Sequence, residues 1–145
     1  MSDVKVHLRN VAGTEAAMGW AGSHTIVADR PVSKAGGLGL GFNGAELLAL
    51  AIGGCFCNDL RYVAHTRGAD LAEIDVRVTL TLEGDPVMAT SAEMTVTCVT
   101  SGGTDGSAIV EEAKTTCMVS NSISRGVPVS IATSTKGDRA QSFEP

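Results

Sequence analysis

The sequence predicts an α+β domain, and three observations support that prediction. Residues 74–82 alternate apolar and polar side chains, which is typical of a half-buried strand. Residues 92–98 repeat this alternation after the turn signal Gly84-Asp85-Pro86, so the two segments are expected to form a hairpin. Residues 47–56 are instead apolar on every side of a helix. An antiparallel hairpin together with a separate buried helix is typical of the α+β class.

The composition is that of one globular domain covering residues 1–145. Hydrophobic residues make up 43% of the 145 residues and charged residues 19%, a balance that favours a packed core. The net charge is −5 and the basic residues are scattered, so no surface for a nucleic acid backbone is expected. Aromatic residues make up only 3%, which argues against stacking platforms for bases or sugars.

Neither a membrane span nor an export signal is predicted. The longest apolar run, residues 47–57, is shorter than the roughly 20 residues that cross a bilayer. The first ten residues, MSDVKVHLRN, contain no hydrophobic signal region. We therefore expect a cytosolic protein without a membrane partner, in which the four cysteines remain thiols.

The first third of the chain is predicted to be extended and then irregular. Val4, Val6 and Leu8 alternate with polar residues, as in a half-buried strand. A second extended piece is expected over residues 18–28. Residues 33–44 contain five glycines, more than a regular element tolerates, which predicts a mobile loop.

A long apolar helix is predicted to follow this loop. Asn43 is a good N-cap, and Glu46 three positions later completes a capping box. The helix should end near Arg67, with Gly68 just beyond its last turn. Because the half formed by residues 47–56 has no polar face, either a sheet wraps this helix or a second subunit covers it.

After the hairpin, the sequence predicts a second helix and a last strand. The helix is expected from about residue 105 to residue 122, and a short strand over residues 129–132. The tail after Lys136 is expected to fray. The predicted inner face of the second helix consists of Ile109, Ala113, Thr116 and Cys117.

Cys98 is interpreted as a structural cysteine, and no metal site is expected. Cys98 lies on the inward face of its strand, where a buried cysteine packs as a small hydrophobe. Cys55 and Cys57 are separated by about 200° around a helix, so they cannot bind one ion together. The three histidines show no metal-ligand spacing.

Cys55 and Cys117 lie on apolar helix faces beside small residues, which leaves two interpretations open. The small neighbours allow tight packing between helices, in which case both thiols are inert. They also allow a substrate to approach the sulfur atoms. The spacing of the residues does not decide between these interpretations.

Two segments resemble the OsmC/Ohr family of thiol peroxidases, in both motif and order. These are GFNGAELLALAIGGCFCNDLRYVA and, some sixty residues later, EEAKTTCMVSNSISRGVPV. The resemblance implies an OsmC-like fold, an intertwined homodimer with curved antiparallel sheets around central buried helices. It also implies that Cys55 attacks an organic hydroperoxide, that Cys117 resolves the product as a disulfide, and that a lipoyl-type dithiol reduces it. No bound organic cofactor or metal is implied.

The chain departs from the characterised peroxidases of this family at the residues that activate the thiol. Ala45 stands where those enzymes have a glutamate, and Ala35 stands near the position of their arginine, so the chain resembles a less characterised OsmC-like branch. Arg30 and Lys34 are the candidate replacement cations. Asp59, one turn after Cys55, would raise the pKa of the thiol if it faced the site.

These departures leave functions from three classes in view. The first is a cysteine peroxidase that reduces organic hydroperoxides. The second is a redox sensor or small-ligand binder that has the fold without peroxidase turnover. The third is a structural interaction domain with inert buried cysteines.

Overall fold

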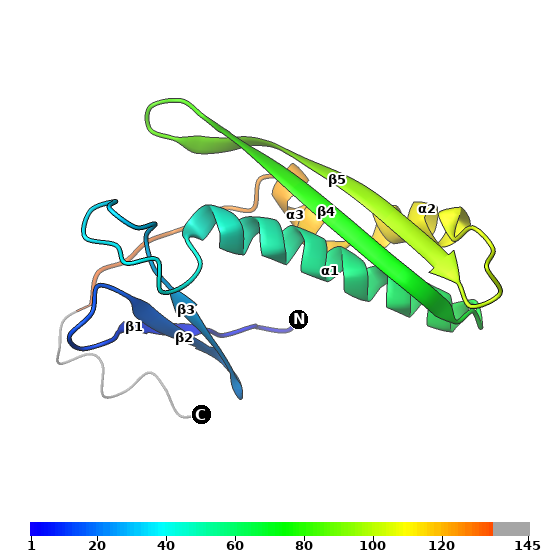
Figure 1. Cartoon of the computed structure of the whole chain (residues 1–145), viewed down its shortest axis with the longest axis horizontal. Coiled ribbons are helices and arrows are strands. Elements are labelled where there is room, and N and C mark those ends of the chain that lie inside the picture. The colour runs from blue at the N-terminus through cyan, green and yellow to red at the C-terminus, as the bar shows by residue number, and fades with distance from the viewer. Residues whose placement is uncertain (135–145) are drawn as a thin grey trace. The chain divides into compact units, whose positions relative to one another are not determined.

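The computed structural model describes residues 1–134, which form eight regular elements in two compact units (Figure 1). Of the described residues, the first unit comprises 1–43 and 127–134, and the second comprises 44–126. The predicted organisation as a single domain stays a prediction. The elements are β1 (His7–Asn10), β2 (Ala17–Ala21), β3 (His24–Ala28), α1 (Gly44–Thr66), β4 (Leu71–Glu83), β5 (Met88–Thr100), α2 (Ser107–Thr116) and α3 (Met118–Ser124).

The first unit contains a three-stranded antiparallel sheet in the order β1-β2-β3. The extended piece predicted for residues 18–28 is two strands, because the chain reverses at Gly22, whose φ is +59°. The predicted first strand begins only at His7, so Val4 and Val6 precede it and are exposed. Alternation in the sequence identified extended chain here, but it did not show where the strand acquires a hydrogen-bonded neighbour.

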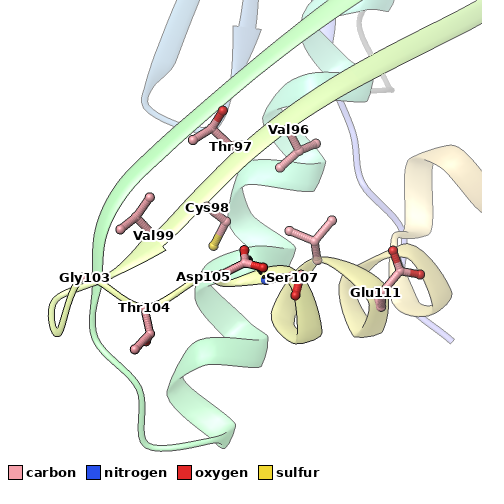
Figure 2. A pocket seen from close by; sticks show the side chains of 10 residues that line it. Val96, Thr97, Cys98, Val99, Gly103, Thr104, Asp105, Ser107 and Glu111 are labelled. Atoms are coloured by element: carbon pink, nitrogen blue, oxygen red, sulfur yellow. Dashed lines mark hydrogen bonds between the residues drawn. The ribbon is translucent and has the colours of Figure 1, made fainter.

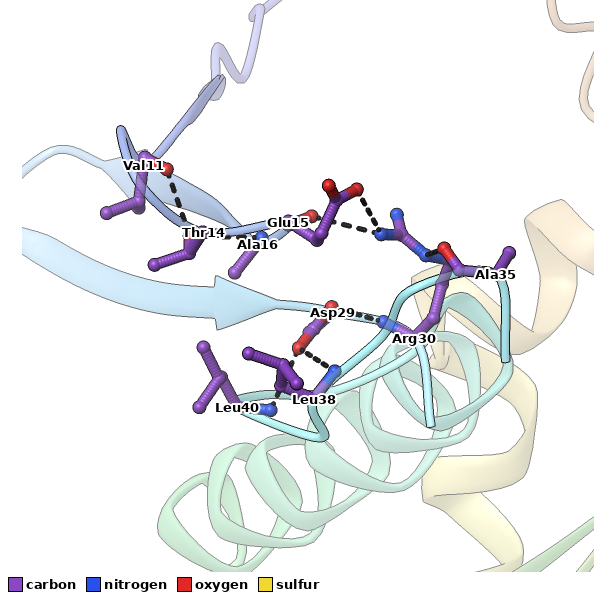
Figure 3. A network of polar contacts seen from close by, with 9 residues as sticks. All are labelled: Val11, Thr14, Glu15, Ala16, Asp29, Arg30, Ala35, Leu38 and Leu40. Atoms are coloured by element: carbon purple, nitrogen blue, oxygen red, sulfur yellow. Dashed lines mark hydrogen bonds and ion pairs between the residues drawn. The ribbon is translucent and has the colours of Figure 1, made fainter. Parts of the chain in front are cut away.

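The glycine-rich loop of the first unit has no helix or strand, as predicted, and is organised around the buried Asp29 (Figure 3). One oxygen of Asp29 accepts hydrogen bonds from the amides of Leu38 and Leu40 at 3.1 and 3.0 Å, and the other accepts from the amide of Arg30 at 2.8 Å. The Leu40 amide is the main reason why the pKa of Asp29 is lowered. The mobility expected of this loop stays a prediction.

The second unit consists of the β4–β5 hairpin and the helices that pack against it. In Figure 1 the hairpin runs along α1, and Ile74 of β4 pairs with Cys98 of β5 in antiparallel register. The predicted hairpin is confirmed, as is the long helix, which ends before Gly68 with φ of +65°. The hydrophobic core of the second unit comprises Phe56, Leu60, Val63, Ala64, Cys98, Ile109, Ala113 and Cys117.

The N-terminal half of α1 is buried on one side only within the single chain. Ile52 and Phe56 are buried, and a Cβ added to Gly53 would meet Val78 of β4 at 3.0 Å. Leu50 is 52% exposed. A two-stranded hairpin covers only one face of a helix, so no sheet of the described residues wraps α1 on every side. The other alternative, that a second subunit covers the remaining face, stays a prediction.

By length and composition alone, α1 would qualify as a membrane span, as the core helices of many water-soluble proteins also do. Its contacts with β4, α2 and α3 are those of a core helix. The prediction that the chain has no membrane span counted only the uninterrupted apolar run of residues 47–57. The whole helix α1 has 23 residues, so by length it passes a test that the shorter run does not.

Two further predictions about the C-terminal third need correction. The second helix is divided into α2 and α3 at Cys117, whose ψ of 110° is not helical, and Thr116 is exposed rather than on the inner face. Within residues 1–134, the segment 129–132 forms no strand, and Val129 and Ile131 are exposed. The predicted fraying after Lys136 lies outside the described residues.

Candidate functional site

Two cysteines and one aspartate from distant parts of the sequence converge in the second unit. Cys55 and Asp59 lie one turn apart on the same face of α1, and Cys117 lies at the junction of α2 and α3. Their two sulfur atoms and one carboxylate oxygen all lie within 4.8 Å of one another. Cys55 Sγ donates to Asp59 Oδ2 at 3.6 Å. We call these three residues the thiol cluster.

The break between α2 and α3 orients Cys117, and Asn121 holds this break in place. The Cys117 amide donates to the Ala113 carbonyl at 3.0 Å, which continues the bonding pattern of α2. The Asn121 side-chain amide donates to the carbonyls of Cys117 and Thr115 at 2.8 and 3.2 Å. The Cys117 carbonyl also accepts the backbone amide of Asn121, so the side chain of Asn121 links the first turn of α3 to the Thr115 carbonyl at the end of α2. This link stabilises the kink at Cys117.

The surroundings of Cys55 favour the neutral thiol. The pKa of Cys55 is raised, first by burial and then by Cys117 and Asp59, while a hydrogen bond from the Val119 amide acts in the opposite direction. The expected effect of Asp59 is therefore confirmed. The charged groups acting on Cys55, namely Cys117 and Asp59, are both acidic. Burial and the acidic neighbours therefore oppose formation of the Cys55 thiolate, and the Val119 amide favours it.

Cys117 is fully buried, but its sulfur has a polar neighbour at the wall of a groove. Cys117 Sγ donates to Ser120 Oγ at 3.3 Å. Ser120 also lines a groove of about 360 Å³, together with Leu48, Ile52 and Met94. This groove is mainly apolar and adjoins the thiol cluster through Ser120.

The other two cysteines lie outside the thiol cluster. Cys98 is buried in the core, as predicted, and burial raises the pKa of its thiol. It lines a separate cavity of about 450 Å³ near Asp105 and Ser107 (Figure 2), to which neither Cys55 nor Cys117 contributes. Cys57 is half-buried, and all four thiols are free.

The candidate cations Arg30 and Lys34 belong to the first unit, whereas the thiol cluster belongs to the second. Arg30 forms an ion pair with Glu15 at 3.0 Å, and its Nε donates to the Ala35 carbonyl at 3.2 Å (Figure 3). Both proposed cation roles therefore stay predictions.

Sequence reasoning found the two cysteines of the cluster but not the whole arrangement. The spacing of four residues between Cys55 and Asp59 was visible, yet nothing in the sequence related Asp59 to Cys117. Asn121 was part of the recognised motif without a structural role. The Val119 amide is a backbone group, so no residue type could have indicated it.

The architecture and the thiol cluster define an α+β protein with a pair of free cysteines between a core helix and a helix junction. A family model described as OsmC-like protein matches residues 36–132, more than half of the chain, and the chain belongs to this family. A comparison with curated proteins gives no match.

Solved structures confirm the OsmC-like fold. An OsmC-like protein of unknown function from Vibrio cholerae has a TM-score of 0.72 at 13% identity, covering 84% of this chain and 94% of its own. An OsmC-like protein from Mycoplasma pneumoniae has a TM-score of 0.69 at 13% identity, with 87% and 89% covered. An organic hydroperoxide resistance protein from Legionella pneumophila has a TM-score of 0.61 at 20% identity, with 87% and 91% covered.

Proposed function

We propose that this protein reduces organic hydroperoxides by a thiol–disulfide cycle between Cys55 and Cys117. The observation that carries the proposal is the approach of the two sulfur atoms, which lie within 4.8 Å of each other although 62 positions separate them in the sequence. Membership of the OsmC-like family and the hydroperoxide resistance function in the name of the Legionella relative support a peroxide-related role.

The cycle has three balanced steps. The Cys55 thiolate attacks the terminal peroxide oxygen, the O–O bond breaks, and the alkoxide leaves and takes up a proton to become an alcohol. The resulting Cys55 sulfenic acid condenses with the Cys117 thiol to form a disulfide and water. A dithiol, of the lipoyl type by family resemblance, then restores both thiols and is itself oxidised to a disulfide.

The groove beside Ser120 suits the organic part of such a substrate. Its wall is formed mainly by apolar side chains, including Leu48, Ile52 and Met94, and Ser120 contacts Cys117. An alkyl or aryl group in this groove would lie next to the thiol cluster and would lose contact with water. We therefore expect bulky organic hydroperoxides to react faster than hydrogen peroxide.

The assembly that we propose is a cytosolic homodimer. Leu50 on α1 is a large apolar side chain that is 52% exposed, and large apolar side chains of the first unit are exposed as well. Exposed apolar surface of this kind is commonly buried against a partner protein. A second copy of the same chain is always available as that partner, so we propose a homodimer. A reducing compartment would keep the cluster in the dithiol form that the cycle requires.

The test is peroxide consumption by wild type and by Cys55→Ser with cumene hydroperoxide and several dithiols, dihydrolipoamide among them. We expect turnover in wild type and none above background in Cys55→Ser. Cys57→Ser is the matched control, since it changes the same residue type on the same helix outside the cluster, and it should retain activity. Equal rates in wild type and Cys55→Ser would contradict the proposal.

Disulfide mapping tests the resolving role separately. One equivalent of hydroperoxide should link Cys55 to Cys117, while Cys57 and Cys98 remain open to alkylation after unfolding. A Cys55–Cys57 link would contradict the assignment of Cys117.

Two observations favour the alternative of a redox sensor or small-ligand binder. The charged groups that act on Cys55 are both acidic, and Ala45 stands where the characterised peroxidases have a carboxylate that works with an arginine. A sensor needs a single oxidation per signal rather than rapid turnover. Formation of the Cys55–Cys117 disulfide without catalytic consumption of hydroperoxide would favour this alternative.

A further inference from the structure

The thiol cluster brings together three donors of the kinds that bind zinc. Zinc bonds are about 2.3 Å to a cysteine sulfur and about 2.0–2.2 Å to a carboxylate oxygen. At tetrahedral angles these lengths place a sulfur and an oxygen ligand about 3.6 Å apart, and two sulfur ligands about 3.8 Å apart. Cys55 Sγ and Asp59 Oδ2 are at the expected separation of 3.6 Å. Cys117 Sγ lies within 4.8 Å of Cys55 Sγ and of a carboxylate oxygen of Asp59, so its side chain would move closer to both when an ion binds.

Two of the three donors lie on one helix, and the third lies at a hydrogen-bonded helix junction. Cys55 and Asp59 share one face of the 23-residue helix α1, so their separation is fixed by the helix itself. Cys117 is fully buried, and the two side-chain hydrogen bonds of Asn121 hold its backbone. A cation would therefore meet donors that are already placed, which reduces the entropic cost of binding.

The charge balance of the cluster also suits a divalent cation. When deprotonated, the two thiolates and the carboxylate carry three negative charges, and the charged groups acting on Cys55 are acidic. Thiolate ligands favour zinc and other thiophilic ions over magnesium or calcium, which prefer oxygen.

We propose that Cys55, Asp59 and Cys117 bind one Zn²⁺ ion per chain, with water in the fourth position. The ion would occupy the same two thiols that the proposed cycle uses, but the inference does not depend on turnover. Zinc would block peroxide attack while bound, and formation of the Cys55–Cys117 disulfide would remove two of the three ligands. Zinc binding and oxidation are therefore mutually exclusive states of this cluster.

The test is a titration of the fully reduced full-length chain with Zn²⁺ in competition with a chromophoric chelator, under anaerobic conditions. We expect one ion bound per chain, and we expect Co²⁺ to give the intense visible spectrum of a tetrahedral site with sulfur charge-transfer bands. Oxidation of the protein by one equivalent of hydroperoxide should abolish binding, and reduction should restore it. Absence of stoichiometric binding by the reduced wild type would overturn the inference.

Variants assign the ligands. Cys55→Ser and Cys117→Ser should each weaken binding by about 100-fold or more, and Asp59→Asn by about 10-fold or more. Cys57→Ser and Asp75→Asn are the matched controls outside the cluster and should bind as wild type does. Asp59 is half-buried, so Asp59→Asn keeps the inference testable if Cys117→Ser does not fold. Wild-type affinity in both Cys55→Ser and Asp59→Asn would overturn the assignment.

The zinc and peroxidase measurements fail independently. Stoichiometric zinc binding without hydroperoxide turnover in the metal-free protein would leave this site in place and remove the proposed cycle. Hydroperoxide turnover by Cys55 without zinc binding would support the proposed cycle and overturn the zinc site.

Discussion

The two units of the chain differ in what holds them together. The second unit has a hydrophobic core in which Leu60 and Cys117 are fully buried. Among residues 1–43 and 127–134, the buried residues of the first unit are small or charged, namely Ala16, Gly19, Asp29 and Gly37. Many of its large apolar side chains, including Leu8 and Phe42, are exposed.

The difference follows from the length of the elements. A 23-residue helix and two 13-residue strands can press apolar faces against each other over many contacts. Strands of four and five residues cannot do so, and the first unit relies on hydrogen bonds such as those of Asp29. The thiol cluster, whose three donor atoms must stay close together, lies in the second unit, which has the hydrophobic core.

The largest effect is expected in the core of the second unit. Leu60→Ala should lower the free energy of unfolding by about 2–5 kcal/mol, because Leu60 is fully buried and its loss leaves a cavity. Leu82→Ala, at a position 46% exposed, is the control and should change stability by about 0.5 kcal/mol or less. Denaturant unfolding measures both, and equal losses would remove the contrast between core and surface.

A charge on the open face of α1 should separate the proposed dimer. Leu50→Arg would bury an unpaired charge at the interface, costing about 3 kcal/mol or more, which is about a 100-fold weaker dimer. Thr66→Arg, at an exposed position near the end of the same helix, should have little effect. Sedimentation measures the association. A wild type that is a folded monomer at micromolar concentration would contradict the dimer.

The first unit should show the clearest dependence on acid. The lowered pKa of Asp29 means that its carboxylate adds stability above the ordinary aspartate pKa of about 3.9, and that this stability is lost as the pH falls through the lowered value. Asp29→Asn should therefore lower the melting temperature at pH 7, and the difference from wild type should shrink below about pH 4. Asp70→Asn, at an exposed position, is the control. A difference that is the same at both pH values would contradict the role of the charge.

The smallest effect concerns backbone strain in the glycine-rich loop. Ala35 has a φ of +46°, a conformation that costs a side-chain-bearing residue about 1–2 kcal/mol and costs glycine little. Ala35→Gly should therefore raise stability by up to about 1 kcal/mol. Ala17→Gly, in strand β2, should lower it instead, because glycine weakens a strand. If both variants are destabilised, strain at Ala35 is not relieved by glycine.

Much of the second unit could be predicted from the sequence because its signals are local and long. The alternation over residues 74–82 and 92–98 identified both strands and the face that Cys98 occupies. Gly68 correctly marked the end of α1. The short segments gave weaker signals, so the hairpin of β2 and β3 was taken for one extended piece and residues 129–132 for a strand.

The sequence by itself determined the fold class, the family and the two cysteines on which the proposed function rests, because periodicity, turn residues and motif spacing are written along the chain. Only the tertiary structure decided that Cys117 ends α2, and that Asp59 joins both cysteines in one cluster. Their proximity results from packing between α1 and the α2–α3 junction, and from Asn121 bonding across the helix break. Contacts of this kind depend on many distant residues at once, so no local pattern encodes them.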